Sequence, residues 1–350
     1  MVRYIDGLIL FVLNQMNGER TISGALHLLK GKKSSQTIQD AKLFQLSFLF
    51  GMQRTLDRSH IEESVLVLYQ NGFLEKVSQD TYKVNEKGNV ALEGFLKQHP
   101  FPPYLNGWKY HQITEVFWAR ISLFMQTLSH SVNNNMIFYP VIRDEQVQEW
   151  VRKHFPKKSE KRERIARSLY EELTQVLRKL PEAHARLFVL RLSGFHRTGL
   201  TFHQSCSTLH ISNEQGLLFF YGVIHACITH TRDDPATFPI LSSFVENKRI
   251  PVPLTASTRT TYSLLQKGMT FQQIMDIRRL KRSTIEDHIV EIAINVAGFS
   301  IDSFVSKQSQ EDILKASNET NSQRLKTIRD HLNDRYGYFE IRLTLCKEGV

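Results

Sequence analysis

The chain has 350 residues, enough for two or three compact units, and its content of 41% apolar and 10% aromatic residues excludes a largely disordered protein. The formal net charge of +10 favours a polyanionic partner such as nucleic acid, and three irregularly spaced cysteines exclude a disulfide framework. No stretch reaches the apolar length of a membrane span, so we expect a cytoplasmic, nucleoid-associated protein without a membrane partner.

The first segment begins with two helices. Apolar residues follow helical spacing from Ile5 to Met16, which favours an amphipathic core helix over a signal peptide. A second helix is expected to open at Ser23 and to end at Gly31. A third apolar stretch covers residues 41–50.

A further helix and a small hairpin complete this segment. Ser59 and Glu62 have the spacing of a capping box, which predicts a helix that ends near Gly72. Strand-like runs at 73–77 and 81–84 flank a short turn. Helices followed by a hairpin predict a winged-helix-like domain over residues 1–98.

The stretch "LLKGKKSSQT" resembles the end of a phosphate-binding loop. That loop needs a glycine five places before Gly31, and the sequence has Leu26 there. Lys33 stands where the hydroxyl that holds Mg²⁺ belongs, and a helix rather than a strand precedes the stretch. The sequence therefore excludes a nucleotide loop here.

The middle of the chain is expected to be helical. Residues 99–160 form a linker, rich in proline at its start, and a helical segment; residues 161–250 form a helical domain with a possible helix-turn-helix. Between Arg152 and Arg167, eight Lys/Arg residues stand against two Glu residues. This run is either a solvated helix face or a surface that contacts phosphates.

The last segment, residues 251–350, contains the most informative stretch. Gly268 ends one helix, and Thr270 with Gln273 forms a capping box for the next. Ser283 with Glu286 has the same spacing at the start of a following helix. Two helices joined by a tight turn predict a helix-turn-helix, whose second helix enters a major groove.

The start of that second helix is basic. Arg278 and Arg279 lie in the turn, and Lys281 and Arg282 lead the helix, followed by Ser283 and Thr284. A structural helix pair needs no such cluster next to an N-terminus that already favours anions. We therefore expect these residues to contact DNA.

This segment resembles the helix-turn-helix module at the C-terminus of RecQ-type helicases, through "TTYSLLQKGMTFQQIMDIRRLKRSTIEDHI", "RLKTIRDHL" and "YFEIRLTL". The first segment is similar to the winged-helix domain of the same helicases, with Gly51 and 72–74 at two of the family's glycine positions. The resemblance implies that Lys30, Lys32 and Lys33 contact the DNA backbone.

Two further resemblances concern the central segment and the chain as a whole. The stretch from "LRKLPEAHARLFVLRLSG" to "GLTFHQSCSTLHIS" is similar to the helix-turn-helix of sigma-factor region four. The arrangement as a whole resembles the YpbB-type helix-turn-helix proteins of Bacillus and relatives, which carry such modules without a motor. A nucleotide loop, an acidic helicase motif and a four-cysteine zinc site are all missing from the sequence.

The sequence therefore predicts a mainly α-helical, multi-module DNA-binding protein that is not an enzyme and has no cofactor. The resemblance implies that it acts on a duplex, fork or junction with a RecQ-type helicase in trans, in DNA repair or replication. A sequence-specific transcription regulator is the alternative. The DNA contacts we expect are Lys30, Lys32, Lys33, Arg278, Arg279, Lys281, Arg282, Ser283, Thr284 and His288.

Two enzymatic or metal-binding interpretations are weaker. His203, Cys206 and His210, followed by a second His/Cys group at 225–230, have no familiar zinc spacing, so we expect no metal there. Glu246 and Lys248, with two aspartates upstream, fit a metal-dependent nuclease pattern, but the surrounding prolines favour a linker.

Overall fold

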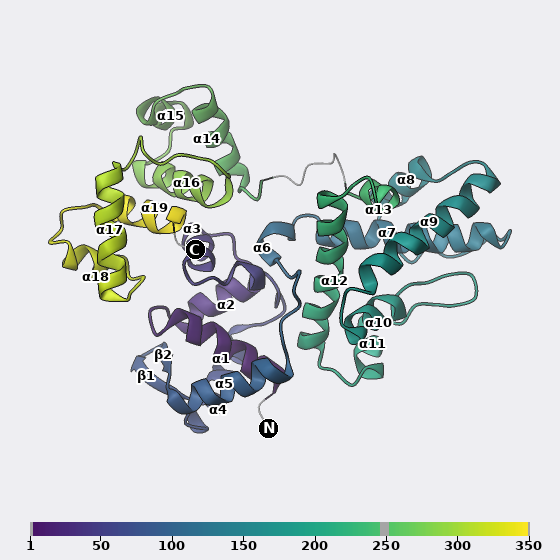
Figure 1. The fold of residues 1–350 in the computed structure, drawn as a ribbon, viewed down its shortest axis with the longest axis horizontal. Helices are drawn as coiled ribbons and strands as arrows, with labels where there is room; N and C mark the ends of the chain where they lie inside the picture. Colours follow the sequence, from purple (N-terminus) through teal and green to yellow (C-terminus); the bar gives the residue numbers. More distant parts are fainter. Residues whose placement is uncertain (1–2, 246–251, 349–350) are drawn as a thin grey trace. The chain divides into compact units, whose positions relative to one another are not determined.

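The computed structural model describes residues 3–245 and 252–348, and it confirms a mainly α-helical, multi-module protein (Figure 1). The chain forms two compact units. Residues 6–95 and 251–350 make up what we call the terminal unit, and residues 1–5 and 96–250 the central unit. The boundaries expected at 98, 160 and 250 stay predictions, but the first and last segments belong to one unit.

The terminal unit is built from both ends of the chain, and the outer ends of α1 and α5 cross its boundary. Its elements before the central unit are α1 Tyr4–Met16, α2 Ile22–Lys30, α3 Ser35–Leu43, the short 3-10 helix η1 Ser47–Leu49, α4 Arg58–Gln70, β1 Leu74–Ser78, β2 Thr81–Val84 and α5 Glu86–Gln98. Its elements after the central unit are α14 Ala256–Gln266, α15 Phe271–Arg278, α16 Arg282–Asn295, α17 Lys307–Thr320, α18 Leu325–His331 and α19 Tyr338–Glu348.

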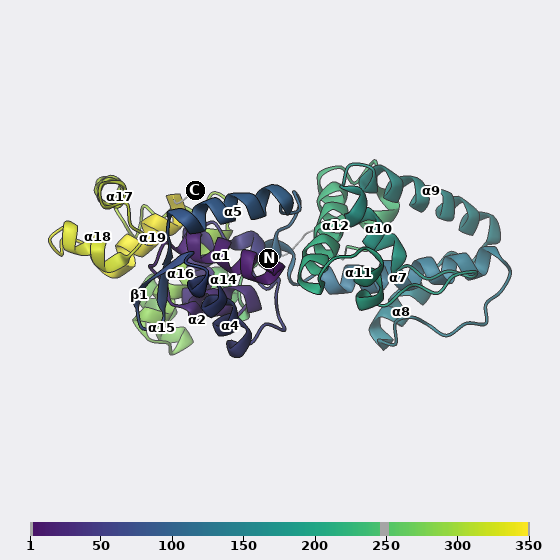
Figure 2. The same ribbon diagram turned by 90° about the horizontal axis from the view of Figure 1, so that it is seen from below.

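The predicted hairpin is confirmed. β1 and β2 pair antiparallel, with Leu74 opposite Val84, and within the described residues they form the only sheet (Figure 2). Both of these residues are buried, whereas most other positions of β1 are exposed. The helices predicted from Ile5 to Met16 and up to Gly31 are also confirmed.

The apolar stretch 41–50 is divided between two elements: it begins inside α3, whose N-terminus is capped by the side chain of Ser34, and Gln45 then adopts a left-handed conformation before η1. The capping box predicted at Ser59 is wrong, because Asp57 is the N-cap of α4: its side chain accepts the N–H of His60 at 2.9 Å, and the helix starts two residues earlier than predicted.

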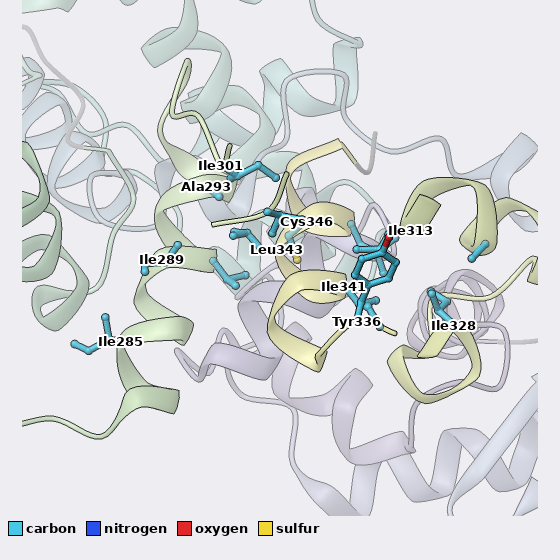
Figure 3. Packing of buried hydrophobic residues seen from close by; sticks show 14 of the residues in the cluster. Ile285, Ile289, Ala293, Ile301, Ile313, Ile328, Tyr336, Ile341, Leu343 and Cys346 are labelled. Atoms are coloured by element: carbon cyan, nitrogen blue, oxygen red, sulfur yellow. The ribbon is translucent and has the colours of Figure 1, made fainter. Parts of the chain in front are cut away.

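The core of the terminal unit joins the two chain ends. Figure 3 shows Ile289 on α16 and Leu343 and Cys346 on α19 among a cluster of buried apolar side chains. Leu43, at the end of α3, packs against the same cluster. In Figure 1, α3 and α19 lie side by side although they come from opposite ends of the sequence, and α3 also packs on α16.

The central unit is a helical bundle around α12. The middle and most of the second half of α12 are buried, and α7, α9, α10, α11 and α13 pack against it. Within the described residues, no helix is both long and apolar enough to cross a membrane. The elements are α6 Gly107–Tyr110, α7 Thr114–Val132, α8 Glu145–His154, α9 Ser159–Leu177, α10 Glu182–Leu190, α11 Phe202–Thr208, α12 Asn213–Asp233 and α13 Pro239–Ser243.

The possible helix-turn-helix of this unit consists of α11 and α12. Thr201 and Gln204 form a capping box at the start of α11, and His210 turns the chain with a φ of 55° before α12 begins. Beyond its first turn, α12 is largely buried in the bundle, so most of its length offers no face that a DNA groove could accept.

Candidate nucleic-acid interface

The helix-turn-helix predicted near the C-terminus consists of α15 and α16. Thr270 and Gln273 form the expected capping box: the hydroxyl accepts the N–H of Gln273 at 3.3 Å, and the amide oxygen accepts the N–H of Thr270 at 2.9 Å. α15 ends at Arg278, and α16 begins at Arg282 after a three-residue turn. The sequence thus placed the start of α15 and the turn correctly.

Arg279 makes this turn without the usual glycine. It adopts the left-handed conformation, with φ 49° and ψ 43°. This conformation costs a residue with a side chain on the order of 1 kcal/mol. The surrounding packing holds the backbone in place, and the Arg279 side chain is left exposed to solvent.

The start of α16 differs from the prediction. Ser283 is not a cap, because Lys281 occupies the cap position and makes no side-chain bond to the first turn. Glu286 instead accepts a hydrogen bond from Nε of Arg282 at 2.9 Å. A helix N-terminus without a side-chain cap leaves backbone N–H groups available to an anion.

Three basic side chains remain accessible at this helix start. Arg279 and Lys281 are exposed, and the Arg282 side chain is 73% exposed despite its pair with Glu286. Ser283 is also exposed, and Thr284 is half-buried. Positive charge and hydroxyl groups therefore gather where a helix-turn-helix meets DNA.

Arg278 and His288 do not belong to this accessible group. The guanidinium of Arg278 donates to the carbonyl of Ser257 at 2.9 Å and to Oγ1 of Thr261 at 2.8 Å, which ties α15 to α14. The same Thr261 oxygen lies 2.8 Å from Nδ1 of His288, whose side chain is buried. We therefore remove His288 from the DNA contacts and assign Arg278 a positioning role.

The rest of α16 faces the protein interior. Ile285, Ile289 and Ile292 are fully buried, and Glu291 is 6% exposed. Burial raises the pKa of Glu291. Hydrogen bonds from Thr258 and Thr255 and the nearby charge of Lys33 lower it, but the effect of burial is larger. Only the first two turns of α16 can therefore reach a DNA groove.

The basic stretch near the N-terminus lies between α2 and α3. Lys30, Lys32 and Lys33 are exposed. Gly31 has a φ of 76°, and a Cβ added to it would lie 2.8 Å from the Cα of Gly51. This close approach fixes the turn, so the lysines project from a rigid backbone rather than from a nucleotide loop.

The N-terminal and C-terminal basic groups are parts of the same unit. Lys33 influences Glu291 of α16, as described above. Glu19 accepts hydrogen bonds from Oγ of Ser322 at 2.9 Å and from the N–H of Gln323, and Arg324 donates to the carbonyl of Gly18. Sequence reasoning missed these contacts, because residues some 300 positions apart leave no local pattern.

In the histidine and cysteine groups of the central unit, His203 and His210 are exposed, whereas Cys206, His225 and Cys227 are buried. His225 is fully buried, with Nδ1 accepting the N–H of Asn106 and Nε2 lying 3.0 Å from Oγ1 of Thr114. Among the described residues, no three His, Cys, Asp or Glu side chains converge to hold a metal ion. The nuclease pattern at Glu246–Lys248 lies outside the residues that the structure describes.

Comparison with known proteins supports a helix-turn-helix in the last segment of the chain. Residues 257–345 match the family described as "Helix-turn-helix domain", which places the chain among helix-turn-helix proteins and supports DNA binding. The chain is also 36% identical to Protein YpbB of Bacillus subtilis (strain 168), over 99% of this chain and 98% of that protein. The chain therefore belongs to the YpbB family. No solved structure matches it.

Proposed function

We propose that this protein is a non-enzymatic accessory factor that holds duplex, forked or junction DNA for a RecQ-type helicase acting in trans, in DNA repair or replication. The observation that carries the DNA-binding part is the exposed group of Arg279, Lys281 and Arg282 at the start of α16. Guanidinium and ammonium groups at that point of a helix-turn-helix attract phosphates and set the register on the duplex.

The RecQ partnership rests on a combination of features. The terminal unit brings a segment similar to the winged helix of these helicases together with one similar to their helix-turn-helix. The sequence offers no nucleotide loop of its own. A separate chain can supply such modules only if it binds the motor, which raises the local concentration of DNA-binding surface near it.

The first test is the salt dependence of duplex binding. The three phosphate contacts of Arg279, Lys281 and Arg282 should contribute about −2.7 to the slope of log K against log salt on duplex DNA. Changing all three to Gln should remove this contribution and weaken binding, which leaves only the slope that the other phosphate contacts produce. The matched control changes Lys307, Lys315 and Lys326, three exposed lysines of α17 and α18, to Gln for the same loss of charge. Equal slopes in both triple variants would remove the start of α16 from the interface.

The second test concerns the helicase. The protein, purified with the RecQ-type helicase of its own source, should form a stable complex and increase unwinding of a forked duplex at subsaturating helicase. Changing Lys30, Lys32 and Lys33 together to Ala should abolish this stimulation while the complex survives, because these side chains contact phosphate in our proposal. Absence of both a complex and a rate change contradicts the partnership. A single strong motif selected from random duplexes would favour the transcription regulator instead.

A further inference from the structure

The central unit carries an unpaired basic surface where α8 ends and α9 begins. Seven of the eight Lys/Arg side chains between Arg152 and Arg167 are exposed, and none of the eight forms an ion pair with any residue that the structure describes. Elsewhere in the same unit, by contrast, exposed Arg186 lies 3.7 Å from the carboxylate of Glu182. The surface is therefore a concentration of positive charge that the protein itself does not neutralise.

The eighth side chain fixes the backbone of this surface. Nε of Arg162 donates to the carbonyl of Pro156, and its Nη2 donates to that of Lys157, both at 2.9 Å. The guanidinium also lies over the ring of Phe155, 5.4 Å from its centre. The bend between α8 and α9 is thus held in one conformation, with Lys157 and Lys158 directed to solvent.

An apolar hollow of about 370 Å³ lies directly beside these charges. Leu123, Phe138, Val151 and Phe155 contribute apolar walls. Polar groups line it as well: Thr127, Gln148, Arg152 and Lys157. A hollow of this size can accept one or two nucleobases, and its amide and hydroxyl groups can bond to base edges.

The connection from α7 to α8 forms one wall of the hollow, and its backbone is fixed. The amide of Gln126, which is buried, donates to the carbonyl of Tyr139 at 3.0 Å and accepts the N–H of Val141 at 2.9 Å. The ring of Phe138 packs on His130, with the ring centres 4.4 Å apart. Even so, the Ile137 and Tyr139 side chains are 91% and 95% exposed.

We infer that this surface of the central unit binds single-stranded nucleic acid. Lysine and arginine side chains neutralise the phosphates, bases enter the hollow, and Tyr139 offers a ring on which a base stacks. This combination of a basic path and aromatic platforms is how proteins hold single strands without reading their sequence. A duplex does not fit, because its bases are already stacked and paired. The inference is independent of the helicase partnership, since it concerns the central unit only.

The test measures binding of the full-length chain to a labelled 20-nucleotide oligo-dT by fluorescence anisotropy. All variants carry the Gln substitutions at residues 279, 281 and 282, so that the helix-turn-helix does not contribute. Tyr139→Ala should weaken binding about tenfold, within the range for one lost stacking contact, whereas Tyr139→Phe should bind as before. Equal binding by Tyr139→Ala and its parent would overturn the inference.

The charges are tested in the same assay. Lys157→Gln with Lys158→Gln should reduce the salt slope by about 1.4, as expected for two contacts on a single strand. Arg178→Gln with Lys179→Gln, at the other end of α9, removes the same charge and should leave the slope unchanged. Equal effects of both pairs would mean that only net charge matters, which contradicts a local site.

A direct readout identifies the surface without a variant. An oligonucleotide that carries 5-iodouracil should crosslink under light to a peptide that contains Tyr139, and mass spectrometry locates the crosslink. Crosslinks confined to the terminal unit contradict the inference. So does Tyr139-dependent binding to anionic phospholipid vesicles combined with no binding to oligo-dT, because that result would identify a membrane as the partner.

Discussion

At the scale of single residues, the buried His225 acts as a neutral hydrogen-bonding group. The hydroxyl of Thr114 donates to the carbonyl of Tyr110 at 2.8 Å, so it accepts from Nε2–H of His225. Nδ1 of His225 accepts from the N–H of Asn106. Both ring nitrogens are satisfied only in the neutral form, and burial lowers the pKa of His225 to about 3.

This arrangement predicts that acid destabilises the central unit. A histidine whose pKa is lower in the folded than in the unfolded chain contributes stability that is present above about pH 6.5 and is lost as the pH falls below it. His225 alone should remove about 1.4 kcal/mol of the free energy of unfolding between pH 7.5 and 5.5. All three tryptophans, Trp108, Trp118 and Trp150, lie in the central unit, so tryptophan fluorescence during urea unfolding measures this change.

His225→Gln supplies the comparison. The variant is expected to be less stable at pH 7.5 but to show a weaker dependence on pH. His184, whose pKa burial lowers to about 4, accounts for part of the remaining slope. The exposed His60 lies in the terminal unit, so His60→Gln should leave the pH dependence of the tryptophan signal from the central unit unchanged. An unaltered pH dependence in His225→Gln would show that His225 is not the titrating group.

At the scale of elements, the capping-box spacing marks a helix start at only one of the three places where the sequence predicted it. Thr270 caps α15 as its spacing with Gln273 predicts. The same spacing misled at Ser59 and Ser283, which lie inside their helices. There the glutamates expected to complete the boxes pair with arginines one turn earlier, as Glu286 does with Arg282.

Substituting a capping residue and substituting a residue inside a helix should have different effects on the stability of the protein. Thr270→Ala removes a cap and should lower the free energy of unfolding by about 1 kcal/mol. Ser283→Ala removes no cap and should change it by less than about 0.5 kcal/mol. Hydrogen exchange of the α15 amides compares the two variants. Equal protection in both would contradict the assigned helix starts.

At the scale of the whole molecule, the two ends of the chain fold as one unit. α3 packs on α16 and α19, and Leu43 lies against the core cluster of the C-terminal helices. A cavity in that core should therefore destabilise the N-terminal elements as well, although α3 ends at residue 43 and α16 begins only at residue 282.

Ile289→Ala tests this coupling. The substitution removes a fully buried side chain and should cost about 2–5 kcal/mol, depending on how far the site collapses. Amide exchange should then accelerate in α2, α3 and the hairpin together with α16. Tryptophan fluorescence should show no change in the central unit. Leu187→Ala, in the core of the central unit, is the matched control and should produce the opposite pattern. Exchange confined to α14–α19 would indicate two separate domains.

The sequence by itself determined the features that depend on neighbours within about one helical turn. The capping box at Thr270, the end of α2 at Gly31, the hairpin and the basic helix start all follow from spacings of a few residues. The net charge likewise indicated a polyanionic partner. These signals are local because backbone hydrogen bonds in helices and turns join residues three or four positions apart.

Only the tertiary structure decided which basic residues are free. Arg278 and Arg279 are adjacent and chemically identical, yet Arg278 binds α14 while Arg279 faces solvent. His288 is placed against Thr261, 27 positions away, and Glu19 against Ser322, 303 positions away. Packing between distant segments fixes such contacts, and a single sequence holds no periodic signal for them, because the chain between the partners can take any length.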